Sequence, residues 1–131
     1  MITKTLIEEK DRLEFLPTHI GKNFLRYEFL IYRFMEMFCE NYSGGYWDFY
    51  EMSNEGIFIS LNTENEFHVS NPNNYFDDKM SAEAVSIGVN LYALNTLMDT
   101  PDPEQLINLY YALRDFACEH KEANKILQFI D

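Results

Sequence analysis

Residues 42–56 read YSGGYWDFYEMSNEG, and this stretch predicts the centre of the fold. Its small residues at 43–45 are typical of a helix end, because glycine adopts the left-handed backbone found there. Residues 46–52 are rich in aromatic side chains and follow the two-residue period of a β-strand. Ser-Asn-Glu-Gly at 53–56 is typical of a turn, and apolar residues alternate again over 57–61. We therefore predict a β-hairpin.

An amphipathic helix is predicted directly before this hairpin, over residues 24–42. Its apolar side chains follow steps of three and four residues, namely Tyr27, Ile31, Phe34, Met35, Phe38 and Tyr42. After the hairpin, residues 66–70 are expected to form a third strand that continues the meander. An asparagine-rich loop follows at residues 71–74.

Three more helices are predicted after that loop. Ser81 is placed to cap the first, which should end near Met98. Asp102 is placed to cap the second, with Pro103 at its first position. A short final helix is expected over residues 122–130. The uncharged stretch at 84–98 is too short to span a bilayer, so we expect a buried helix and no membrane association.

The length of 131 residues suits one domain, here residues 1–131. With 47% hydrophobic residues the chain can build a packed core. The order helix, strands, helices predicts an α+β fold, in which a small antiparallel sheet of three or more strands packs against about four helices.

The charge is strongly acidic, with a formal net charge of -12. Such a charge repels phosphate backbones, so direct nucleic-acid binding is not expected. It also suggests an alternative function, in which the protein mimics DNA and occupies the DNA-binding site of a partner protein. A mimic needs a continuous row of carboxylates, whereas the only adjacent acidic pairs are Glu8-Glu9 and Asp77-Asp78. Mimicry is therefore kept only as an alternative.

The cellular setting follows from the cysteines and the first residues. Cys39 and Cys118 lie far apart, and the charged start of the chain does not look like a signal peptide. We expect a cytoplasmic protein with reduced thiols.

No catalytic or metal-binding motif is evident. His19, His68 and His120 lack metal-ligand spacing, so we predict no enzyme activity, no cofactor and no metal. One enzymatic alternative remains, because Asp48 and the later Asp77-x-Lys79 resemble the acidic pair and lysine of Mg²⁺-dependent nucleases. Asp77 and Lys79 are expected in a loop, which weakens this alternative.

Protein recognition is the better explanation of the aromatic strand. Trp47 and Phe49 share one face, which is expected to be buried. Tyr46, Asp48 and Tyr50 alternate on the other face as amphipathic groups suited to a protein interface. Glu51 shares the Trp47 face and is expected at a sheet edge or in an ion pair.

Several motifs together resemble the ArdB/KlcA antirestriction family. They are Leu16-Pro17, Arg26-Tyr27-Glu28, the block at 42–56, the segment at 80–84 and the segment at 111–117. The resemblance extends from about Leu13 to the C-terminus, and only residues 1–12 and the asparagine-rich loop depart from it. It implies an α+β protein of plasmids or other mobile elements that protects incoming DNA from type I restriction endonucleases and has no assigned enzymatic activity.

Our leading hypothesis is a non-enzymatic protein that relieves type I restriction through direct or indirect contact with the restriction-modification system. The candidate interaction residues are Tyr46, Asp48, Tyr50, Glu51, Ser53, Asn54, Arg26, Glu28, Asp115 and Asp131. For Glu28 the simpler interpretation is a carboxylate in the first helical turn, stabilised by the helix dipole. The exposed tyrosines are equally suited to a homodimer.

Overall fold

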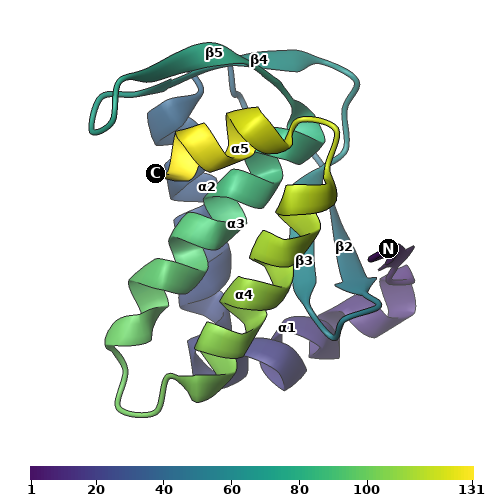
Figure 1. The fold of residues 1–131 in the computed structure, drawn as a ribbon. Coiled ribbons are helices and arrows are strands. Elements are labelled where there is room, and N and C mark those ends of the chain that lie inside the picture. Colours follow the sequence, from purple (N-terminus) through teal and green to yellow (C-terminus); the bar gives the residue numbers. More distant parts are fainter.

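Five α-helices pack together, and two small antiparallel sheets lie on the outside of them (Figure 1). The computed structural model describes residues 1–131. The helices are α1 (Arg12–Ile20), α2 (Phe24–Phe38), α3 (Ala82–Thr96), α4 (Glu104–Glu119) and α5 (Ala123–Ile130). The strands are β1 (Lys4–Leu6), β2 (Trp47–Met52), β3 (Ile57–Leu61), β4 (Glu66–Asn71) and β5 (Phe76–Ser81). Single turns of 3-10 helix lie at Glu9–Asp11, Gly21–Asn23 and Leu97–Asp99. The predicted α+β class is confirmed.

Helix α3 lies at the centre, in contact with α2, α4, α5 and β3. Eleven of its fifteen residues are buried, which confirms the prediction made from the uncharged stretch. The predicted cap is also confirmed, because Ser81 Oγ accepts a hydrogen bond from the Ala84 N–H at 3.1 Å. Gly88 lies where α3 meets α5, and a Cβ there would come within 2.5 Å of the Phe129 ring. This glycine therefore allows the two helices to pack closely.

The predicted hairpin is confirmed, with Trp47 opposite Leu61 and Glu51 opposite Ile57. Strand β1 pairs with the other edge of β2, so the first sheet has the order β1-β2-β3. Strand β3 is buried on both faces, because Phe58 and Ser60 are covered as well as the expected apolar face.

The predicted meander is wrong. Strand β4 pairs with β5 in a second sheet and not with β3. Figure 1 shows this second sheet above α5. The sequence predicts a loop where the structure has β5. Only Phe76 and Met80 of this strand are buried. Because these two residues are four positions apart, the sequence does not show the two-residue period that is typical of a strand.

Side chains of α3 occupy the edge of β3 that a third strand of the meander would need. Asn90 Oδ1 accepts the Ile59 N–H at 3.0 Å, and Asn90 Nδ2 donates to the Ile59 carbonyl at 2.8 Å. The Leu61 N–H donates to Ser86 Oγ at 3.0 Å. Because buried backbone groups must be paired, α3 here replaces a neighbouring strand.

Two predicted helix ends differ from the structure. Helix α2 ends at Phe38 and not at Tyr42, because Cys39 turns extended and forms a β-bridge with Val69 of β4. Asp102 does not cap α4, which begins at Glu104 without a side-chain cap.

The asparagine-rich loop fastens the C-terminal helix. Asn71 is fully buried and its Nδ2 donates to Tyr92 Oη at 2.6 Å and to the Phe129 carbonyl at 3.1 Å. Asn74 Nδ2 donates to the carbonyls of Gln128 and Phe129. These bonds satisfy carbonyls at the end of α5, which lack partners within the helix.

Both cysteines are free thiols, Cys39 buried and Cys118 exposed, as the sequence predicts. Burial raises the pKa of the Cys39 thiol to about 12. None of the helices has the length and apolar character needed to cross a membrane.

The replacement Asn90→Leu tests how much the α3–β3 contact stabilises the fold. It leaves the Tyr27 hydroxyl and both backbone groups of Ile59 buried without partners, so we expect a loss of about 3 to 5 kcal/mol in the free energy of unfolding. Denaturant titration measures this loss. Asn95→Leu, at an exposed position of the same helix, is the matched control and should change stability by less than about 0.5 kcal/mol. Equal effects of the two replacements would contradict the assignment.

Candidate functional site

The aromatic strand buries one face, as predicted, since Trp47 and Phe49 are both in the core. The other face is mostly engaged by the N-terminal segment. Arg12 Nη2 pairs with Asp48 at 3.1 Å, and Arg12 Nη1 donates to the Trp47 carbonyl at 2.9 Å. The Arg12 guanidinium also lies 4.9 Å from the centre of the Tyr46 ring. The Asp48 side chain is therefore only 14% exposed.

Of the three predicted recognition residues on this face, Tyr46 is the one left open to solvent, with 54% of its surface exposed. Tyr50 stacks on Phe58 with ring centres 5.1 Å apart, and the Lys4 ammonium lies over its ring at 4.5 Å. Met52, the next residue on this face in the two-residue period of the strand, is buried. Strand β1 and Arg12 thus cover most of the β2 face that the alternating sequence pattern predicts as a contact surface for a partner protein.

The polar residues of the turn also make internal bonds. Ser53 Oγ accepts the Thr3 N–H at 2.9 Å, and the Ser53 N–H donates to the Thr3 carbonyl. Asn54 Nδ2 donates to the Ala112 carbonyl of α4 at 2.9 Å. A Cβ on Gly56 would lie 2.8 Å from the Ala112 side chain, so glycine allows the turn to approach α4 closely. The turn is held against both the N-terminus and α4.

One hollow of about 360 Å³ brings predicted site residues together where the turn meets α4. We call it the hairpin hollow, and its lining is His19, Glu51, Asn54, Glu55, Gln105, Asn108, Leu109 and Ala112. Glu51 lies 3.6 Å from His19 Nε2, as expected for a carboxylate that needs a partner. Glu55 is exposed and has a positive φ of 70° at the tip of the turn. The hollow is acidic at its rim and offers amide groups within.

The other predicted residues lie elsewhere. Arg26 is exposed and 3.7 Å from Asp99, while Asp115 is exposed on α4 and Asp131 ends the chain. Glu28 is the fifth residue of α2, so its interpretation as a first-turn carboxylate is wrong. Its side chain faces Tyr32, whose pKa is raised by burial and by the Glu28 carboxylate.

The nuclease residues are not brought together as a constellation. Asp77 and Lys79 are on β5 of the second sheet and not in the expected loop, whereas Asp48 is on β2 of the first sheet. Asp48 is already paired with Arg12. No group of three or more His, Cys, Asp or Glu side chains is arranged to hold a metal ion.

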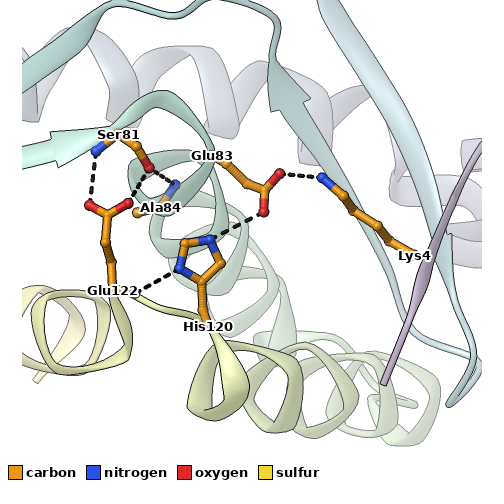
Figure 2. Close-up of polar contacts among 6 residues, drawn as sticks. All are labelled: Lys4, Ser81, Glu83, Ala84, His120 and Glu122. Carbon is orange, nitrogen blue, oxygen red and sulfur yellow. Dashed lines mark hydrogen bonds and ion pairs between the residues drawn. The ribbon is translucent and has the colours of Figure 1, made fainter. Parts of the chain in front are cut away.

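A second polar cluster joins three distant segments of the chain (Figure 2). Glu122 accepts hydrogen bonds from the N–H and the hydroxyl of Ser81. His120 Nδ1 accepts the Glu122 N–H at 3.0 Å, so its Nε2 carries the proton and donates to Glu83 at 3.2 Å. Glu83 also pairs with Lys4 of β1. The cluster ties the N-terminus and the α4–α5 connection to the start of α3.

The charge of Glu83 is strongly favoured in this cluster. The hydrogen bond from His120 and the ammonium of Lys4 lower the pKa of Glu83 to about 2, although its partial burial acts in the opposite direction. Glu83 also lies in the first turn of α3, where the helix dipole favours an acid. The sequence contained the signal for the helix start, but not for Lys4 or His120 as partners.

Comparison with known proteins assigns the family. The sequence pattern described as "Antirestriction protein" matches residues 40–131. Two proteins of Escherichia coli named antirestriction protein KlcA are 38% and 35% identical; the alignments cover 99% of this chain and 94% and 95% of theirs. The chain belongs to the KlcA/ArdB antirestriction family. The resemblance found in the sequence is thereby confirmed.

A solved structure of this family superposes with a TM-score of 0.92 at 36% identity, covering 99% of this chain and 95% of that one. Its description reports a novel fold for KlcA and ArdB, and antirestriction activity against type I DNA restriction systems in vivo but not in vitro. The hairpin hollow and the Glu83 cluster both lie mainly within the residues that match the family pattern.

The pKa of Glu83 predicts how stability depends on pH. A carboxyl whose pKa is lower in the folded than in the unfolded state stabilises the fold above its ordinary pKa of 4.5, and this stabilisation is lost as the pH falls towards 2. We expect Glu83→Gln to lower the free energy of unfolding by about 1 to 2 kcal/mol at pH 7 and by almost nothing at pH 2. The loss at pH 7 is smaller than the pKa shift alone would give, because the partners of Glu83 are partly exposed to solvent. Denaturant titrations at several pH values measure this difference. Glu64→Gln, at an exposed position outside every ion pair, is the control. If the loss of stability in Glu83→Gln did not change with pH, the stabilisation of the fold by the Glu83 charge would be contradicted.

Proposed function

We propose that this protein relieves restriction by type I restriction-modification systems in the bacterial cytoplasm and so protects incoming plasmid or phage DNA. The observation that carries the proposal is the likeness to the KlcA and ArdB structure over nearly the whole chain, at 36% identity. KlcA and ArdB are described as active against type I DNA restriction systems in vivo.

The proposed mechanism is non-enzymatic. The carboxylates of the nuclease alternative lie in two separate sheets, and one of them is neutralised by Arg12. All three histidines are engaged with carboxylates, His19 with Glu51, His68 with Asp77 and His120 with Glu83. None of them is paired with a serine or cysteine nucleophile, as acyl-transfer chemistry would need.

The acidic surface supports contact with a protein better than mimicry of DNA. Carboxylates on several elements are interrupted by bases, since Asp48 pairs with Arg12, Glu83 with Lys4 and Asp78 with Lys125. A duplex presents about one negative charge per 1.7 Å along its axis, without such partners. We therefore assign the charge of -12 to solubility and to steering of a partner.

The hairpin hollow is the contact surface we favour. Glu51 and Glu55 supply exposed carboxylates, while Asn108 and the other amides supply hydrogen-bonding groups around a small apolar floor. A basic and polar protein surface is the complementary partner.

The activity is tested by plating unmodified phage on a host with a type I restriction system, with and without the expressed protein. Expression should raise the plating efficiency on this host and leave it unchanged on a host without the restriction system. Unchanged plating on the restricting host at verified expression would exclude the function.

The contact surface is tested by Glu51→Lys/Glu55→Lys in the same assay. Reversing both charges should weaken partner binding by roughly tenfold and reduce the gain in plating, because unlike charges become like charges. Glu64→Lys/Glu66→Lys makes the same change in net charge on the β3–β4 connection and the start of β4, and should plate as the unchanged protein does. If both double variants behave alike, the hairpin hollow is not the contact surface.

The need for a further cell component is tested with purified restriction enzyme and DNA. KlcA and ArdB are described as active in vivo but not in vitro, which favours an indirect route for this chain too. The purified protein alone should leave DNA cleavage unchanged, and added cell extract should allow inhibition. Inhibition by the purified protein alone would show a direct route instead.

A further inference from the structure

Helix α2 has a second face that nothing in the chain covers. Its buried face consists of Tyr27, Ile31, Met35 and Phe38. On the opposite side three large apolar residues remain exposed, Leu25 by 67%, Phe29 by 62% and Met37 by 57%. They are spaced at four or eight residues, so they line up with Arg33 along one stripe of the helix. Large apolar side chains gathered on one face mark an interaction site.

Charged residues border this stripe in an order that the isolated helix disfavours. Exposed Arg26 lies in the first turn of α2, and exposed Glu36 lies in its last turn. A helix dipole favours acids at the start and bases at the end, so both charges are at the less favourable end. An antiparallel partner helix with the same charges would bring opposite charges together at both ends.

The sequence of α2 is self-complementary when two copies run antiparallel about Ile31. Arg26 is then level with Glu36 of the second copy. Phe29 lies beside Arg33 of the second copy, an arrangement that suits a cation–π contact. Leu25 comes level with Met37 of the second copy. Each pair occurs twice, because a two-fold axis uses the same patch on both subunits.

We infer that this protein forms a homodimer in which the exposed faces of two α2 helices pack antiparallel. Arg26 makes only a weak ion pair within the chain, 3.7 Å from exposed Asp99, and Glu36 is exposed. They are therefore free to pair across the dimer.

A groove beside the stripe supplies a place for the partner's methionine. It measures about 290 Å³ and is bordered by Leu13 of α1, Leu25 of α2 and Phe49 of β2. Leu13 is itself 89% exposed and extends the apolar surface beyond α2. Methionine fills irregular apolar gaps readily, which suits Met37 of the second copy at this position.

The expected dimer interface is small, so the fraction of dimer depends on the protein concentration. Fifteen residues of helix are about 22 Å long, and two such helices with their flanks bury less than about 1,200 Å². The surface is distinct from the hairpin hollow, and the homodimer is independent of the proposed antirestriction function.

Sedimentation velocity of the purified full chain over a roughly hundredfold range of concentration tests the inference. The mean mass should rise from that of one chain towards that of two. A single-chain mass at every concentration would overturn the inference, including the case in which the α2 face binds some other protein.

Charge exchange tests the antiparallel register. Arg26→Glu places like charges opposite each other and should raise the dissociation constant at least about tenfold. Arg26→Glu/Glu36→Arg restores opposite charges and should bring the constant back to within about threefold of the original. Lys121→Glu, at an exposed position after α4, makes the same change in net charge as Arg26→Glu and should leave the constant unchanged. A double variant as weak as Arg26→Glu would overturn the register.

Discussion

The amide of Asn90 is the interaction on which the arrangement of this fold depends. It lies fully buried in the central helix and makes four hydrogen bonds, to the Tyr27 hydroxyl of α2, to both backbone groups of Ile59 in β3, and to the Ser86 carbonyl within α3. One side chain thus fixes two helices and a strand. Every donor and acceptor of the amide is hydrogen-bonded, so its burial leaves no unpaired polar group that would destabilise the fold. The buried amide therefore fixes one specific arrangement of these elements.

Closing the edge of β3 in this way has consequences for the rest of the chain. Strand β4 has no place beside β3 and pairs with β5, and the second sheet then lies over α5. Strand β1 takes the other edge of β2, which brings Lys4 to Glu83 and the N-terminus to the turn. The turn is held between Thr3 and Ala112, and the hairpin hollow forms there. The position of the candidate site therefore follows from how the turn is held by the N-terminus and by α4.

Sequence patterns predicted the elements whose burial is regular and missed those set by tertiary contacts. The hairpin and α3 were predictable, because Trp47 and Phe49 alternate and residues 84–98 carry no charge. Helix α2 was predicted too long, because Tyr42 continues the four-residue spacing after Phe38 although Cys39 pairs with Val69. Strand β1 buries none of its three residues, so it has no pattern to read. Of the site, Glu51 and Asn54 were predicted, whereas the engagement of Asp48 by Arg12 required the folded structure. The family came from motifs and not from periodicity, since periodicity carries no functional information.

The central claim, that side chains of α3 replace a strand along β3, is tested most directly by native-state hydrogen exchange of the Ile59 and Leu61 amides. Both donate to α3 side chains and point away from β2. The account predicts that both amides exchange only through global unfolding, with protection equal to that of the β2–β3 ladder. Exchange at the rate of an uncovered edge strand, while the ladder stays protected, would contradict it.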